Sequence, residues 1–202
     1  MPRNIMITKR DLEILSFINR FGKMTSEDVK QYIGKSIITT RKVLKKLKER
    51  GYIKSQKIFH NQNEIITCTE IGAEMTPYRT CVEIKLSQIE HDLIVGKMYH
   101  PMSRKISHEK YYTDRDMKIL EMFREHRPDI VFETAGRYTA VEIELHKKAD
   151  QRMLEIRKYY EYGENFEKVI YLVQDEGLEN YLLKFFSLYP KFEVLNFKKI
   201  IA

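Results

Sequence analysis

The stretch "RPDIVFETAGRYTAVEIELHKK", Arg127 to Lys148, contains two strand-like runs with a turn between them. Both runs are rich in β-branched and aromatic residues, and "TAGR" supplies the small residues that a hairpin turn needs. Asp129 opens the first run, and Glu142 and Glu144 stand two residues apart on the second. Because side chains alternate across a strand, the two glutamates face the same side of the sheet. The stretch therefore predicts a β-hairpin that carries three carboxylates.

The sequence on either side of this hairpin predicts the rest of an α/β domain. Upstream, Leu86, Ile89 and Leu93 have helical spacing, and Pro101 is expected to end that helix. A strand with a loop (103–118), a short helix (117–129), a helix (148–166), a buried strand (168–175), a helix (176–190) and a last strand (191–201) complete the expected order. This α-β-β-β-α-β-α-β order predicts a mixed sheet with helices on both faces.

The first 76 residues predict a separate domain of three short helices and a hairpin. Thr8, Thr25 or Ser26, and Ser36 are candidate N-caps, and a glycine follows each helix. Residues 53–69 alternate as a hairpin around the turn "HNQN". This is the order of a winged helix-turn-helix. We therefore expect an α+β chain, with a winged-helix DNA-binding domain at 1–76 and an α/β domain at 77–202.

Charge is distributed unevenly between these two parts. The chain of 202 residues has a net charge of +7, with 16 Lys and Arg against 8 Asp and Glu in the first 80 residues. The remaining residues carry 20 basic and 21 acidic side chains. All of the excess positive charge therefore lies in the first part, which indicates that this part contacts a polyanion.

The third predicted helix, residues 36–50, is the most basic element and is the expected recognition helix. Such a helix enters the major groove of double-stranded DNA, where base contacts give specificity and phosphate contacts give affinity. Candidate base contacts are Thr39, Thr40 and Arg41, candidate phosphate contacts are Lys42, Lys45 and Lys46, and candidate wing contacts are Lys54 and Lys57. The alternative is a solvated basic face on a winged helix that contacts proteins. A homodimer on paired half-sites is a further expectation.

Composition excludes several other classes of protein. No apolar run approaches the roughly 20 residues that span a bilayer, and the N-terminus lacks the apolar core of a signal peptide. Cys68 and Cys81 are not spaced as a zinc motif and fit a reducing compartment. We therefore expect a cytoplasmic protein with no membrane partner and no structural zinc.

The carboxylates at Asp129, Glu142 and Glu144 fit a metal site for phosphodiester hydrolysis. Mg²⁺ takes oxygen ligands from one or two carboxylates, and the bound ion polarises a phosphate and generates hydroxide. One alternative is structural, with Asp129 acting as a cap or paired to Arg127 or Arg137, and the glutamates in surface ion pairs. Another is a surface that binds phosphate or protein without cleaving anything.

This segment resembles the metal-binding core of restriction-endonuclease-like nucleases, whose pattern is Pro-Asp, a spacer and Glu-x-Lys. Pro128 and Asp129 match the first part, and Glu142-Ile143-Glu144 stands at the second, with Glu144 replacing the usual lysine. The resemblance implies catalytic and metal-binding roles for the three carboxylates, with Mg²⁺ or Mn²⁺ as cofactor if the site is active. It also implies auxiliary roles for Glu90 and for Lys147 or Lys148.

The whole chain resembles the replication-relaxation family of plasmids, conjugative elements and phages. The resemblance runs from "ITKRDLEILSFINRFGKMTSEDV" through the lysine-rich helix, "TCTEIG", "IEHDLIV", "HRPDIVFE" and "AVEIELHKK" to "KYYEY". It implies double-stranded DNA binding in the replication, relaxation or transfer of a mobile element or its regulation, with replication or conjugation proteins as partners. A metal-dependent endonuclease targeted by the winged helix is the alternative function, and a transcription regulator is the second. The sequence contains no His-x-His pattern with a catalytic tyrosine, which a true relaxase needs, so strand transfer is not expected.

Overall fold

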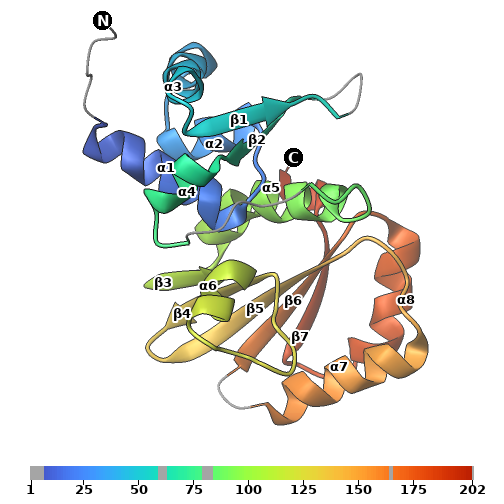
Figure 1. The fold of residues 1–202 in the computed structure, drawn as a ribbon. Coiled ribbons are helices and arrows are strands. Elements are labelled where there is room, and N and C mark those ends of the chain that lie inside the picture. The colour runs from blue at the N-terminus through green and yellow to red at the C-terminus, as the bar shows by residue number, and fades with distance from the viewer. Residues whose placement is uncertain (1–6, 59–62, 79–83, 164–165, 202) are drawn as a thin grey trace, which may run out of the picture. The chain divides into compact units, whose positions relative to one another are not determined.

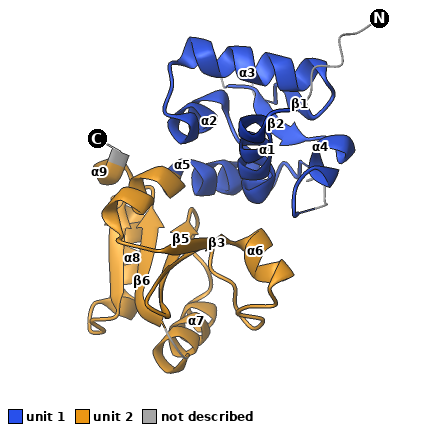
Figure 2. Cartoon of the chain, turned by 90° about the vertical axis from the view of Figure 1, so that its left-hand side faces the viewer, with its two compact units in different colours: residues 1–97 blue, residues 98–202 orange. Residues whose placement is uncertain are grey.

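The computed structural model describes residues 7–58, 63–78, 84–163 and 166–201 and has two compact units, Met1–Lys97 and Met98–Ala202 (Figures 1 and 2). We expected the second domain to begin at residue 77. In the structure, the first compact unit extends to Lys97. In the described part of the chain, no helix is long and apolar enough to cross a membrane.

The first unit begins with the three expected helices, α1 (Lys9–Phe21), α2 (Ser26–Ile33) and α3 (Ile37–Glu49). The caps are those that the sequence predicted. Thr8 and Thr25 each form a capping box with the aspartate three residues later, and the Ser36 hydroxyl accepts from the N–H of Thr39. These caps satisfy N–H groups that the first turn of a helix leaves without partners.

A two-stranded wing follows the three helices. Strands β1 (Ile53–Gln56) and β2 (Ile65–Cys68) pair antiparallel, and Met24 adds an isolated bridge to Ile66. A short helix, α4 (Glu70–Glu74), comes next. The first three residues of the expected "HNQN" turn, residues 60–62, lie outside the described residues. Helices α1 to α3 and this wing make the topology of a winged helix-turn-helix, as the sequence predicted.

Helix α5 (Ile89–Lys105) is longer than the sequence predicted, because it does not end at Pro101. Proline lacks the N–H that would bond the carbonyl four residues back. The helix continues because Met98 and Met102, on either side of the proline, are both fully buried. In its first half, Asp92 forms an ion pair with the buried Lys23 of the first unit.

The second unit is built on one five-stranded sheet with the order β3-β4-β5-β6-β7. The first three strands are antiparallel, whereas β5, β6 and β7 run parallel, so the sheet is mixed as expected. In the described part of this unit, helices α6 to α9 accompany the second half of α5. The elements are β3 (Lys110–Thr113), α6 (Asp114–Ile119), β4 (Ile130–Thr134), β5 (Arg137–Glu144), α7 (Asp150–Tyr162), β6 (Phe166–Val173), α8 (Glu176–Phe186), β7 (Phe192–Asn196) and α9 (Lys198–Ile201).

Helices cover both faces of this sheet (Figure 1). On one face, α7 and α8 pack on side chains that include Ala140 and Tyr171. On the other face, the ring of Tyr99 from α5 lies 4.4 Å from the ring of Tyr111, measured between centroids. The hairpin between β4 and β5 turns at Ala135 and Gly136, which have φ angles of 50° and 77°. These angles fit the two-residue turn that the sequence indicated.

Candidate nucleic-acid interface and buried carboxylates

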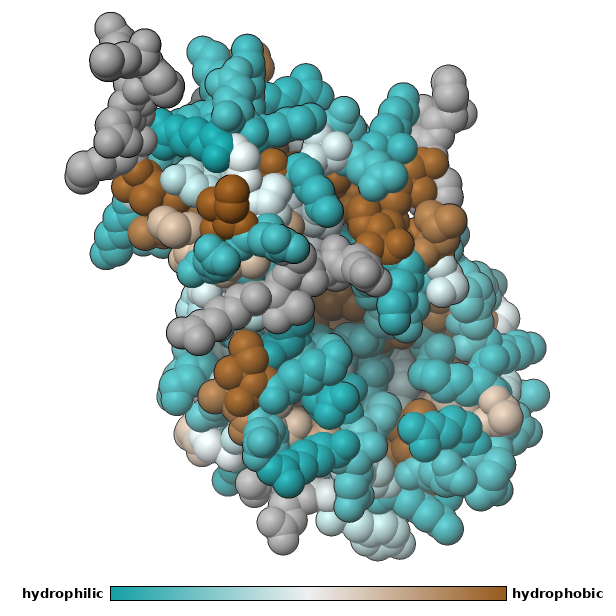
Figure 3. All heavy atoms as spheres, in the orientation of Figure 1, coloured by the Kyte–Doolittle hydropathy of each residue, from teal (hydrophilic) through white to brown (hydrophobic). Residues whose placement is uncertain are grey.

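Helix α3 has one buried stripe and one exposed, basic stripe. Thr40, Leu44 and Leu47 are buried at helical spacing against the rest of the first unit. Arg41, Lys42, Lys45 and Lys48 are exposed, and hydrophilic residues predominate over this part of the molecule (Figure 3). Among the residues that the structure describes, no ion pair is found for Arg41 or Lys42. We call Ile38, Arg41, Lys42 and Lys45 the α3 surface.

The two threonines predicted to contact bases differ in exposure. Thr39 is exposed in the first turn of α3, with its hydroxyl 3.0 Å from that of Ser36. Thr40 is fully buried, and its hydroxyl donates to the Ser36 carbonyl at 3.1 Å. The prediction for Thr40 was therefore wrong, because this side chain belongs to the packed stripe and does not reach solvent.

Lys46 also has a structural partner. Its ammonium lies 2.5 Å from the carboxylate of Asp11, which is buried at the start of α1. Burial by itself would raise the pKa of Asp11, but the bonds from Lys46 and Thr8 outweigh it and hold this pKa below its ordinary value. Lys46 thus joins α3 to α1, and a phosphate contact would compete with this pairing.

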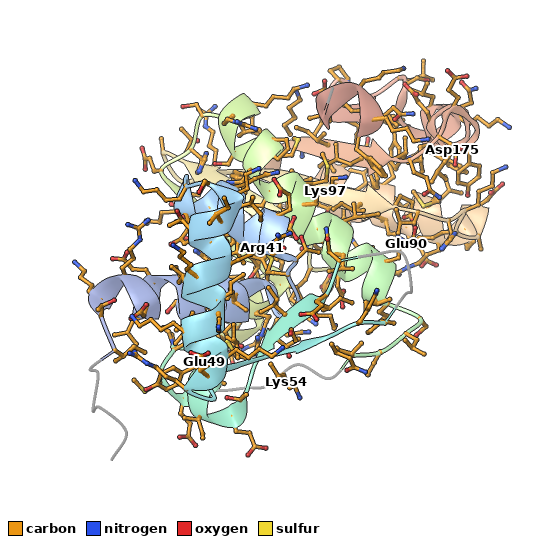
Figure 4. All side chains as sticks on the ribbon, turned by 90° about the horizontal axis from the view of Figure 1, so that it is seen from above. Arg41, Glu49, Lys54, Glu90, Lys97 and Asp175 are labelled. Atoms are coloured by element: carbon orange, nitrogen blue, oxygen red, sulfur yellow. The ribbon has the colours of Figure 1, made fainter. Side chains whose placement is uncertain are left out.

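The wing presents its cations beside α3. Lys54 and Lys57 are exposed, and Figure 4 shows Lys54 on β1 with Arg41 and Glu49 on α3. Lys48 donates to the Ser55 hydroxyl at 2.5 Å, and this hydroxyl donates to Glu64 at 2.6 Å. These two bonds connect the C-terminal part of α3 to β1 and to the residue just before β2. The helix and the wing are therefore joined side by side.

In the second unit, Glu142 is buried and hydrogen-bonded. It is 7% exposed and faces α7, whose Tyr160 donates to its Oε1 atom. The imidazole Nε2 of His126 lies 2.6 Å from the same oxygen. The expected alternative of a surface ion pair is therefore wrong for Glu142, since its partners are a buried phenol and a half-buried imidazole.

Asp129 and Glu144 have partners of their own. Asp129 accepts from the backbone N–H of Ile143 at 2.7 Å, whereas Arg127 and Arg137 pair with Asp114 and Glu167. Asp129 thus bonds to the neighbouring strand β5, and each of the two arginines has a carboxylate partner elsewhere, Asp114 for Arg127 and Glu167 for Arg137.

Glu144 is 6% exposed and forms an ion pair with Lys148, four residues later. Burial raises the pKa of Glu144, Lys148 opposes this rise, and the carboxylates of Glu142 and Asp129 add to it. Of the two lysines considered for an auxiliary role, Lys148 is the one whose ammonium lies beside Glu144. The ammonium of Lys147 instead lies 5.5 Å from the centre of the Tyr181 ring.

Sequence reasoning missed three side chains of this group: His126, Tyr160 and Tyr171. Tyr171 pairs with Glu142 across β5 and β6, and none of the residues that the structure describes bonds to its buried hydroxyl. Burial raises its pKa well above the ordinary value, and Glu142, Glu144 and Asp129 raise it further. His126 stands three residues before Asp129, and this proximity was an available signal. The position of Tyr171 depends on strand register, which the sequence does not show.

Asp129, Glu142 and Glu144 are near enough that the first two raise the pKa of the third. Their bonding does not form a metal site. Among the described residues, no three His, Cys, Asp or Glu side chains form a group that could hold a metal ion. In this arrangement Glu142 and Glu144 bond to side-chain donors and Asp129 to a backbone N–H. The donor set therefore does not fit Mg²⁺ or Mn²⁺ as it stands. Glu90 is exposed on α5 in the first unit (Figure 4), and its auxiliary role stays a prediction.

Comparisons with known proteins give distant structural similarity only. No family model and no curated protein matches the chain. The reduced form of MarR from E. coli is 16% identical, covers 57% of this chain and 73% of its own, and has a TM-score of 0.33. ZitR, a zinc-responsive MarR family member of Lactococcus lactis, is 18% identical and has a TM-score of 0.33. The match covers 61% of this chain and 76% of ZitR. AdcR, the adhesin competence repressor of Streptococcus pyogenes, is 15% identical and has a TM-score of 0.32. The match covers 60% of this chain and 80% of AdcR.

Proposed function

We propose that the protein binds double-stranded DNA through the α3 surface and the wing. One observation carries this proposal: the exposed stripe of a winged helix's third helix holds Arg41, Lys42 and Lys45. In this topology the third helix is the element that enters the major groove. Cations on its exposed face are placed to neutralise phosphates, which supply most of the affinity.

The proposed biological role is that of a replication-relaxation protein of a plasmid, conjugative element or phage. This role includes replication, DNA relaxation or transfer and their regulation, and it gives replication or conjugation proteins as partners. It rests on the sequence resemblance along the chain. The strand order of the second unit supports a restriction-endonuclease-like fold, since three antiparallel strands are followed by two strands that run parallel to the third. A homodimer and a cytoplasmic location belong to the same proposal.

Charge reversal on α3 tests the DNA-binding proposal. The double variant Lys42→Glu/Lys45→Glu is expected to lower affinity for duplex DNA about tenfold or more at moderate salt, because two phosphate contacts become repulsive. Fluorescence anisotropy of a labelled duplex measures the affinity. Lys46 is left unchanged because a glutamate there would face the buried Asp11.

The matched control is Lys158→Glu/Lys184→Glu, which makes the same change of charge at exposed positions on α7 and α8. It should bind DNA as the wild type does. Equal affinity of the Lys42/Lys45 variant and the wild type would reject the proposal. A protein-contact surface would be the remaining interpretation of α3.

A metal-dependent endonuclease is the second candidate function. The observation that favours it is the ammonium of Lys148 beside Glu144, which supplies the amine that the nuclease pattern otherwise lacks. The hydrogen bonds of Glu142 and Asp129 would have to change before a cation could bind. The candidate predicts that supercoiled plasmid is nicked with Mn²⁺ and that Glu142→Gln abolishes nicking.

Glu155→Gln is the matched control for this test, because Glu155 is exposed on α7 and lies outside the carboxylate group. Circular dichroism of Glu142→Gln shows whether the second unit still folds. Intact plasmid with every divalent cation, with duplex binding preserved, would eliminate the endonuclease function and leave the binding function.

A further inference from the structure

We propose that Ile38 contacts the C5-methyl group of a thymine in the major groove, so that the α3 surface selects a duplex site containing an A·T pair. This inference rests on the proposed DNA binding and specifies which base the same surface recognises. Ile38 is 66% exposed and is the second residue of α3. The residues of a recognition helix that contact base edges lie in its N-terminal part.

Ile38 is the first residue of the exposed stripe. Lys42 and Lys45 follow it by four and seven residues, a spacing that places all three side chains on one side of a helix. The buried stripe of Thr40, Leu44 and Leu47 lies on the other side of α3. An apolar side chain is thus presented outward together with the cations that would hold the phosphate backbone.

The chemistry of this side chain selects thymine among the four bases. Isoleucine offers neither a donor nor an acceptor, so it gains nothing from the polar edges of guanine, adenine or cytosine. Thymine alone presents a methyl group in the major groove, and apolar side chains contact it there. Charge complementarity with the cations of the α3 surface favours DNA as the occupant of this surface.

Arg41 extends the expected recognition pattern. It is exposed three residues after Ile38, and in recognition helices arginine binds O6 and N7 of guanine through two hydrogen bonds. We therefore expect a preferred site in which a thymine lies close to a guanine. Thr39, the other exposed residue of this turn, adds a hydroxyl that bonds to several bases and discriminates less.

Removing a single methyl group from the DNA tests the inference. The full chain is first used to select its preferred duplexes from a random pool, and each thymine of the selected site is then replaced by deoxyuridine. At one position, this replacement should weaken wild-type binding about fourfold, the effect of losing one buried methyl group. In Ile38→Ala the same replacement should have no effect, and thymine and uracil duplexes should bind equally.

Two controls separate this contact from general effects. Ile71→Ala removes the same side chain from α4, where it is 57% exposed, and should keep the full preference for thymine. Ile38→Ala should keep the salt dependence of the wild type, because isoleucine neutralises no phosphate. Circular dichroism verifies that Ile38→Ala retains its helices.

The possible results distinguish the thymine contact of Ile38 from DNA binding by the α3 surface as a whole. A methyl preference that disappears only in Ile38→Ala supports the contact. Selection without any consensus, no effect of uracil at any position, or an unchanged preference in Ile38→Ala would overturn it while leaving DNA binding intact. Capture of a protein partner that requires Ile38, without binding to any duplex, would overturn both this inference and the proposed function.

Discussion

At the residue scale, the most unusual feature is the burial of carboxylates on β5. Glu142 and Glu144 are each less than a tenth exposed, although charged groups are rarely buried without partners. Their partners are Tyr160 and His126 for Glu142 and Lys148 for Glu144. Each bond offsets part of the cost of removing a carboxylate from water.

The raised pKa of Glu144 predicts how stability changes with pH. A carboxyl group whose pKa is higher in the folded state binds more protons when folded, so its contribution to stability falls as pH rises above the ordinary value of 4.5. In Glu144→Gln this decline should be absent. The difference in unfolding free energy between the variant and the wild type should therefore shift in favour of the variant as pH rises.

Urea unfolding at a series of pH values from 4 upward measures this difference. Glu155→Gln, at an exposed position on α7, should show no such trend. A difference between Glu144→Gln and the wild type that is constant with pH would contradict the raised pKa.

Alternation along the strand predicted that Glu142 and Glu144 share a face, but it did not predict that this face is buried. Both glutamates point toward the face that α7 and α8 cover, and only the packing of α7 makes Tyr160 a partner of Glu142. Such partners come from contacts between distant segments. They are therefore visible in the structure and not in the local pattern.

At the element scale, local chemistry explains which boundaries were predictable. The starts of α1, α2 and α3 were predicted because Thr8, Thr25 and Ser36 bond N–H groups within their own first turns. Helix α5 was predicted too short because the burial of Met98 and Met102 outweighs the bond lost at Pro101. Burial of this kind depends on other elements and gives no local signal.

The junction between α4 and the wing provides a prediction at this scale. A Cβ atom at Gly72 would lie 1.9 Å from the carbonyl oxygen of Tyr52, which is backbone and cannot rotate away. Gly72→Ala should therefore destabilise the first unit by about 1–3 kcal/mol or more, as overpacking does. Urea unfolding followed by circular dichroism measures the loss.

Gly177→Ala on α8 is the matched control, since its Cβ atom would meet a single side-chain atom, the Oδ1 of the N-cap Asp175, at 3.2 Å and no backbone. Its effect should stay within about 1 kcal/mol, the range of helix propensities. If the two variants unfolded at the same urea concentration, the close approach of Gly72 to Tyr52 would be refuted.

At the scale of the whole molecule, charge separates the two units more clearly than any motif. The sequence predicted a basic first part from the count of its side chains, and α3 presents much of that charge to solvent. Counting did not reveal that Thr40 is buried and that Lys46 is held by Asp11, because both facts depend on which side of α3 packs against the unit. The candidate interface is consequently smaller than the sequence predicted.

The salt dependence of duplex binding tests the central claim most directly. If Lys42, Lys45 and Lys54 each neutralise a phosphate, the logarithm of the association constant should fall against that of salt with a slope of about −2.7 or steeper. In Lys42→Glu/Lys45→Glu this slope should become shallower by about 1.8. Lys158→Glu/Lys184→Glu should keep the wild-type slope. Affinity that is independent of salt, or an identical slope in the Lys42/Lys45 variant, would contradict the assignment of α3 as the DNA-binding element.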